Sequence, residues 1–112
     1  MRIVFTAKGT GWDSDMDPRF GRTQYLLIYD DTTDDMVSFD NREVDKEAHG
    51  AGTKTSQKLF DINPDVLITG NGPGGTARSI LEKTDVEIYT GAGEMSVRKA
   101  YEAFKKNELP KF

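Results

Sequence analysis

Asp65-Val66-Leu67-Ile68-Thr69 runs directly into Gly70-Asn71-Gly72-Pro73-Gly74-Gly75 in the second half of the chain. A short uninterrupted aliphatic run is typical of a strand that is buried on both faces of a sheet. The glycines and the proline behind it indicate a turn, and Ala77, Ile80 and Leu81 then recur at helical spacing. A buried strand that turns into a helix is a unit of α/β folds, so the sequence predicts that class.

Four more strands and two more helices are predicted by the same kinds of pattern. Runs of β-branched and aromatic residues predict strands at 1–7, 24–29, 36–39 and 86–89, in addition to the one at 65–69. Apolar residues at helical spacing predict helices at 50–61 and 76–83, and a third over Val97, Ala100, Tyr101 and Phe104. We expect the tail at 108–112 to lie on the surface.

This order of elements, βββαβαβα, predicts a five-stranded mixed sheet with three helices and the strand order 3-2-1-4-5. The second strand is then antiparallel to the others and forms a hairpin with the third. The other four strands end at one edge, where the loops 9–22, 40–49, 70–75 and 91–93 meet. Open α/β sheets bind ligands at such an edge, and three helix N-termini there would offer N–H groups to an anion. We call this edge the rim and predict a binding site on it.

Composition limits the remaining classes of protein and of site. The chain has 112 residues, which fit one domain, 1–112. Its net charge of −4 disfavours nucleic-acid binding, so we expect no nucleic-acid partner. The chain has no cysteine, which excludes disulfides, thiol catalysis and thiolate-held metal sites. Because it shows neither an apolar run of about 18 residues nor a secretion signal, we expect no membrane partner and a cytoplasmic location.

The turn at 70–75 contains the spacing G-x-G-x-x-G between a strand and a helix, which is the pattern of a dinucleotide-binding turn. Such a site also needs an acidic residue at the end of the next strand, and that strand ends in Tyr89-Thr90-Gly91. Three interpretations stay open. They are a tight packing turn, an anion or cluster site formed by turn amides, and a nucleotide or small-phosphate site.

Other residues suggest functional sites, and each of them also has a second interpretation. His49 is the only histidine and precedes a predicted helix, so it is either a surface or capping residue or a metal ligand. Asp13, Asp15 and Asp17 alternate as in a calcium loop, but the rest of that pattern is missing, which favours a solvated acidic loop. A nuclease is not expected, because the first strand has no acidic residue and the fourth is followed by Gly70-Asn71.

Arg19-Phe20-Gly21-Arg22 places two guanidinium groups around an aromatic ring just before a strand. One interpretation is that Phe20 closes the end of the sheet while the arginines pair with nearby aspartates. The other is that Arg19 and Arg22 form an anion clamp.

Taken together, these segments resemble the dinitrogenase iron–molybdenum cofactor biosynthesis family, in its short stand-alone form. The resemblance lies in Asp17-Pro18-Arg19-Phe20-Gly21-Arg22, His49-Gly50-Ala51-Gly52, Asp65-Val66-Leu67-Ile68-Thr69-Gly70-Asn71 and Gly91-Ala92-Gly93, and it covers nearly the whole chain. It implies a ribonuclease H-like fold without nuclease residues. It also implies a carrier or insertion role for an iron–sulfur-type metal cluster.

The resemblance extends to a set of site residues. His49 would be the metal ligand, since a histidine is implicated in holding the cluster in members of the family that carry one. Arg19, Arg22, Asn71 and Gly72 would supply hydrogen bonds and positive charge. The hypothesis is a non-enzymatic carrier of an iron–sulfur or iron–molybdenum-type cluster, a monomer or weak homodimer, with a cluster-assembly protein as partner. The alternatives are a nucleotide or small-phosphate-binding protein that uses the Gly-rich turn, and a protein-interaction module without a ligand.

Overall fold

Five strands and four helices make up the described part of the chain, residues 1–45 and 50–112 of the computed structural model. The strands are β1 (Arg2–Ala7), β2 (Tyr25–Asp30), β3 (Asp35–Asp40), β4 (Val66–Ile68) and β5 (Glu87–Tyr89). The helices are α1 (Arg42–Asp45), α2 (Ala51–Ile62), α3 (Gly75–Leu81) and α4 (Val97–Lys105). The predicted α/β class is confirmed. Among these described helices, none has both the length and the apolar character needed to cross a membrane.

The predicted number of three helices is wrong, because the described residues include a further single-turn helix, α1. The Asp40 carboxylate accepts a hydrogen bond from the backbone N–H of Arg42 (3.0 Å). The Asn41 carbonyl accepts another from the backbone N–H of Val44 (3.1 Å). Such capping contacts start a helix directly after a strand. A helix of one turn has no apolar stripe, so the spacing of apolar residues does not reveal it.

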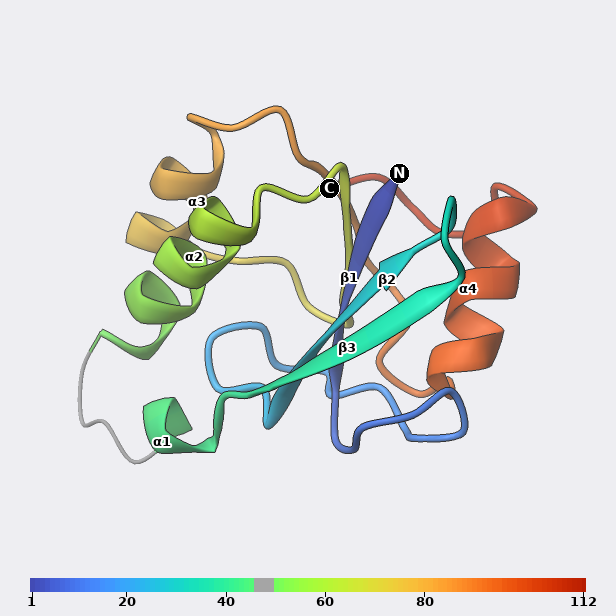
Figure 1. Ribbon diagram of the computed structural model, residues 1–112. Helices are drawn as coiled ribbons and strands as arrows, with labels where there is room; N and C mark the ends of the chain where they lie inside the picture. Colours follow the sequence, from blue (N-terminus) through green and yellow to red (C-terminus); the bar gives the residue numbers. More distant parts are fainter. Residues whose placement is uncertain (46–49) are drawn as a thin grey trace.

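The strands form one mixed sheet in the predicted order, β3-β2-β1-β4-β5. β2 runs antiparallel to β1 and β3, while β4 and β5 run parallel to β1. The register places Phe5 of β1 opposite Leu27 on one side and Ile68 on the other. The strands β1, β3, β4 and β5 therefore end at one edge of the sheet, which is the predicted rim (Figure 1).

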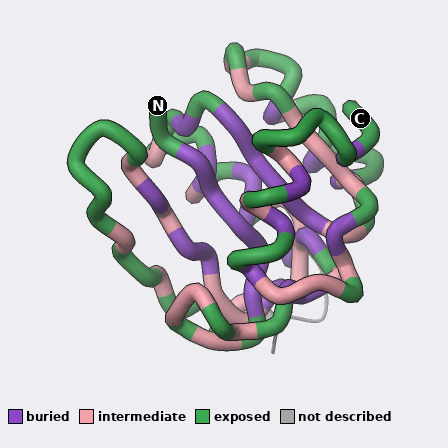
Figure 2. The backbone as a smooth tube through the Cα atoms, turned by 90° about the vertical axis from the view of Figure 1, so that its right-hand side faces the viewer, coloured by how far each residue is buried: buried purple, intermediate pink, exposed green. Residues whose placement is uncertain are grey.

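Helices cover both faces of the sheet, with α2 and α3 on one face and α4 on the other (Figure 1). β4 is buried along its whole length, as expected for a strand covered on both faces. Ile3, Phe5 and Ile68 contribute to the core under α4, and Val4 and Leu67 contribute to the core under α2 and α3. Figure 2 shows these buried segments along the middle strands, with exposed segments at the turns.

The long loop between β1 and β2 (residues 8–24, the β1–β2 loop) is packed into both cores. The Trp12 ring contacts those of Phe5 and Tyr29 edge-on, with centroids 6.0 and 4.8 Å apart. Met16 is buried under α4, and Phe20 is buried on the opposite face of the sheet. These apolar side chains hold the loop in one course across the rim, so the loop can position polar groups there.

We predict that the Asp34→Asn substitution lowers the pKa of Tyr29 towards its ordinary value of about 10. The Tyr29 hydroxyl donates to Asp34 Oδ1 (2.7 Å), and this hydrogen bond, with burial as a second cause, raises the pKa of Tyr29 to about 12. The pair therefore stabilises the fold fully below pH about 10 and loses its contribution as the pH rises towards 12. Asp34 has φ 60°, a conformation that asparagine tolerates, so the variant should fold.

The measurement is an ultraviolet absorbance titration of the phenolates in wild type and Asp34→Asn. A Tyr29→Phe variant identifies which transition belongs to Tyr29. A Tyr29 transition at the same pH in both proteins would contradict the assigned cause.

Candidate functional site

Buried hydroxyl groups attach the β1–β2 loop to the ends of two strands at the rim. The Thr6 hydroxyl donates to the Asp17 carbonyl (2.8 Å), and the backbone N–H of Asp17 donates to the Thr6 carbonyl (2.9 Å). The Thr69 hydroxyl, at the end of β4, lies 2.8 Å from that of Thr6. All three residues are fully buried. The meeting of the loops at this edge is therefore fixed by polar contacts beneath its surface.

Pro18 of this loop lies against both Gly70 and Gly93, and the two glycines also approach each other. The backbone N–H of Asn71 donates to the Pro18 carbonyl (2.8 Å), and that of Gly91 donates to the Gly70 carbonyl (3.0 Å). A Cβ atom at Gly70 would lie only 2.6 Å from Pro18 Cα and 2.8 Å from Gly93 Cα. The three loops can approach this closely only because residue 70 has no side chain.

The contact forms one wall of an open hollow of about 460 Å³ at the rim. The hollow is lined by Pro18, Gly70, Asn71, Gly91, Gly93, Glu94 and Met95. Because glycines contribute much of this lining, backbone groups are near its surface, and backbone N–H groups in turns bind anions. Glu94 is an acidic lining residue, so an anion in the hollow is expected on the side of Asn71.

Arg19, a predicted binding residue, is turned onto the carboxylate of Asp17. Its backbone N–H, Nε and Nη2 donate to that carboxylate at 3.0, 3.1 and 3.2 Å. The backbone N–H of Gln24 donates as well (3.1 Å). The predicted pairing of Arg19 with an aspartate is thus confirmed, while the expectation of a solvated acidic loop is wrong for Asp17. The Arg19 side chain is 45 % exposed, so it still reaches the surface of the rim.

The segment 20–22 connects the hollow to the start of α2. Phe20 is 4 % exposed and packs into the core under α2 and α3, which confirms that it closes the end of the sheet. A Cβ atom at Gly21 would lie 2.8 Å from Gly52 Cα, and the Gly21 carbonyl accepts a hydrogen bond from the Thr55 hydroxyl (2.7 Å). Arg22 follows this contact directly and is half-buried. Its place in the chain puts it on the α2 side of the rim.

The prediction that three helix N-termini offer N–H groups at the rim is wrong for α4. The backbone N–H groups of Val97 and Arg98 donate to carbonyls of the β1–β2 loop at 2.9 and 3.0 Å. The Ser96 side chain caps the same turn. The loop therefore occupies the start of α4. By contrast, the N-cap residues of α2 and α3 are Gly50 and Gly74, and neither helix start has a side-chain cap.

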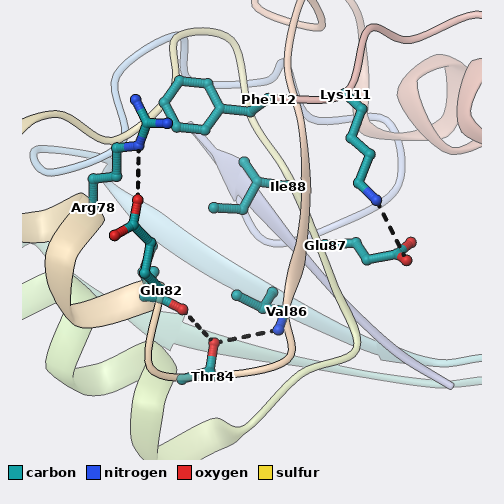
Figure 3. A pocket seen from close by; sticks show the side chains of 9 residues that line it. Arg78, Glu82, Thr84, Val86, Glu87, Ile88, Lys111 and Phe112 are labelled. Carbon is teal, nitrogen blue, oxygen red and sulfur yellow. Dashed lines mark hydrogen bonds and ion pairs between the residues drawn. The ribbon is translucent and has the colours of Figure 1, made fainter.

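Gly72, another predicted binding residue, is covered by the ring of Phe112. A Cβ atom at Gly72 would collide with that ring. The Arg78 guanidinium lies over the ring, 5.0 Å from its centroid (Figure 3). The backbone N–H of Phe112 donates to the Ile88 carbonyl (2.7 Å). The tail at 108–112 is mostly exposed, as predicted, but it is also paired with β5 and packed on the Gly-rich turn.

Comparison with known proteins addresses the family directly. The profile of the dinitrogenase iron-molybdenum cofactor family matches residues 1–107. The chain belongs to this family. The apo form of the orange protein from Desulfovibrio gigas is similar in structure, with a TM-score of 0.91 and 32% sequence identity over 99% of this chain and 92% of that chain. A candidate NifB protein from Thermotoga, of the DUF35 family, gives a TM-score of 0.82 and 28% identity over 98% and 91% of the two chains. A search of curated proteins gave no significant match.

Three of the segments that carry the family resemblance, 17–22, 65–71 and 91–93, meet at the rim. Residues 17–22 and 65–71 are joined by the hydrogen bond between Asn71 and Pro18. The predicted metal ligand His49 lies outside the described residues. In the part of the chain that the structure describes, no group of three or more histidine or acidic side chains is placed to hold a metal ion.

Sequence reasoning missed three residues that shape the site: Pro18, Gly93 and Phe112. Gly93 stands in a short Gly-Ala-Gly segment, and that pattern can indicate a close approach of two backbones. Pro18 gives no comparable signal, and Phe112 belongs to no periodic pattern. Their roles depend on contacts between distant parts of the chain.

We predict that Gly70→Ala lowers the free energy of unfolding by about 1–3 kcal/mol, because the new Cβ atom collides with the backbone of Pro18. Urea unfolding measures the change. The control is Gly11→Ala in the β1–β2 loop, where a Cβ atom would meet nothing within 4 Å. That variant should stay within about 0.5 kcal/mol of wild type. Equal stability of the two variants would sink the packing argument.

A second prediction distinguishes the contribution of the Asp17 side chain to stability from that of its partner Arg19. Asp17→Ala should lower the free energy of unfolding by about 2–4 kcal/mol, because it removes a buried carboxylate and leaves two part-buried backbone donors without their acceptor. Arg19→Ala should lower it by only about 1 kcal/mol, since the carboxylate keeps two backbone donors and the lost side chain is half-exposed. Urea unfolding of both variants tests the order, and the reverse order would be inconsistent with the geometry.

Proposed function

We propose that the chain is a non-enzymatic carrier that holds an anionic iron–sulfur or iron–molybdenum-type cluster at the rim for a limited time. Family membership over residues 1–107 carries this proposal. The likeness to the orange protein, at 32% identity, supports it. The chemistry of the rim also supports it, because the sulfur atoms of such clusters accept hydrogen bonds from protein donors.

Each predicted site residue has a role in this proposal. Arg19 and Arg22 supply positive charge, and the pairing of Arg19 with Asp17 limits where its guanidinium can lie. The Asn71 side chain, exposed beside the hollow, supplies an amide donor, and the Gly72 backbone supplies an N–H group. His49, which precedes the α2 N-cap residue Gly50 in the sequence, supplies a bond to a metal of the cluster.

The donors present suit a cargo that has to leave again. The chain has no cysteine, so a cluster cannot be held by the thiolates that retain resident iron–sulfur clusters. One histidine together with hydrogen bonds binds less tightly than four thiolates. We therefore infer a partner that delivers or receives the cluster, namely a cluster-assembly protein. In this proposal the chain performs no catalytic step and has neither a nucleic-acid partner nor a membrane partner.

The same proposal covers the remaining expectations from the sequence. The strand order and the antiparallel second strand fit a ribonuclease H-like fold. Residues 1–112 would form a single domain that acts in the cytoplasm as a monomer or weak homodimer.

The test is anaerobic loading of the full chain with ferrous iron and sulfide, or with isolated iron–molybdenum-type cofactor. Absorption spectroscopy after desalting measures the chromophore that the protein retains. We expect retention by wild type and about tenfold weaker retention by His49→Ala, the size of effect typical when a metal site is damaged. Gln57→Ala, which replaces an exposed residue on α2, is the matched control and should load like wild type.

Equally little chromophore in wild type and His49→Ala would end the carrier proposal. A thermal-shift panel with nucleotides then separates the alternatives. Stabilisation by a nucleotide favours a small-phosphate site, because a ligand that binds only the folded state raises the unfolding midpoint. No shift with any compound favours an interaction module.

A further inference from the structure

We propose that residues 110–112, which we call the strap, regulate access to the backbone of Gly72 through the ring of Phe112, which acts as a movable cover. The inference rests on the proposed function, because it concerns the same rim. It adds a conformational step between the empty and the loaded protein.

The strap follows the outer edge of β5 and passes along one side of the hollow. Pro110 lies against Gly91, a lining residue, with Pro110 Cδ 3.2 Å from the place of a Cβ atom there. The hydrogen bond from the Phe112 N–H to the Ile88 carbonyl then brings the ring onto Gly72. A ligand that approaches the backbone of Gly72 from this side meets the ring first.

The side-chain contacts that hold the strap are exposed. Lys111 Nζ lies 3.6 Å from Glu87 Oε1, and both side chains are more than half exposed. The Phe112 ring is 46 % exposed, and the Arg78 guanidinium above it is shared with Glu82 (3.1 Å; Figure 3). Exposed ion pairs and cation–π contacts contribute little to stability. The strap backbone stays paired with β5 through the hydrogen bonds from Phe112 N–H to the Ile88 carbonyl (2.7 Å) and from Thr90 N–H to the Pro110 carbonyl (2.9 Å). The Phe112 ring can therefore leave Gly72 by rotation about its own side-chain bonds, without unfolding the sheet.

A second position for the ring lies directly beside the first. A groove of about 180 Å³ lies between α3 and β5, and Phe112 lies at its end (Figure 3). Leu81, Val86 and Ile88 line it together with the polar and charged side chains of Arg78, Glu82, Thr84, Glu87 and Lys111. An apolar cavity of roughly 150 Å³ holds a benzene ring, so the groove is large enough for the phenyl group. The ring can thus exchange its position on Gly72 for one in the groove, where Leu81, Val86 and Ile88 provide apolar contacts.

These two positions make the strap a regulator of loading. A cargo that needs Gly72 uncovered binds only the open form, so its apparent affinity falls in proportion to the open fraction. Binding of the cargo, or of a partner that displaces the ring, shifts the population towards the groove position.

The experiment compares wild type with Phe112→Ala, which removes the cover, and Gly72→Ala, whose Cβ atom pushes the ring away. Phe60→Ala on α2 removes an equally exposed ring and is the matched control (49 % exposed). The readouts are the ring-current shift of the Gly72 α protons by NMR and the initial rate of chromophore gain with ferrous iron and sulfide. Phe112→Ala should lose the shift, and both opening variants should load about threefold faster or more, with the control unchanged.

Two negative outcomes are distinguishable. If wild type loads but Phe112→Ala loads at the same rate, the strap proposal is overturned and the proposed function stands. If no form loads, the proposed function fails, and NMR relaxation dispersion on empty wild type decides the strap alone. Microsecond-to-millisecond exchange of the Gly72 and Ile88 signals that disappears in Phe112→Ala supports the strap, and its absence overturns it.

Discussion

Pro18 and Gly93 both lie so close to Gly70 that a side-chain atom at residue 70 has no room. This contact fixes the course of the β1–β2 loop across the ends of β1 and β4. The same loop brings Trp12 and Phe20 into the two cores and covers the first turn of α4. The positions of the β1–β2 loop and of the loops 70–75 and 91–93 therefore depend on one backbone approach that only glycine permits.

The polar groups of the rim follow from that course. Burial of the Asp17 carboxylate is unfavourable unless donors surround it, and Arg19 together with the Gln24 N–H provides them. The same pairing limits the freedom of the Arg19 side chain before any ligand arrives. A binding site whose charged groups are already ordered loses less entropy when it binds.

The sheet was predictable from the sequence because hydrophobic patterns and short connections leave few topologies. The segment 65–71 shows this best, since its aliphatic run and glycines indicated both the buried strand and the edge on which it ends. What could not be predicted depends on contacts between distant residues. The burial of Asp17, the loop over the start of α4 and the ring of Phe112 on Gly72 leave no local pattern. His49 remains a prediction from family resemblance.

The G-x-G-x-x-G spacing illustrates how one pattern can arise for different physical reasons. Gly70 admits Pro18, Gly72 admits the Phe112 ring, and Gly75 adopts φ 51°, a backbone conformation that favours glycine. Each glycine of the motif is thus required by packing or by backbone geometry, and no dinucleotide is needed to explain the spacing. The glycines that resemble a nucleotide fingerprint instead let a loop and a tail close over the end of β4. For that reason the hollow beside them, and not the turn alone, is the part of the rim with space for a cargo.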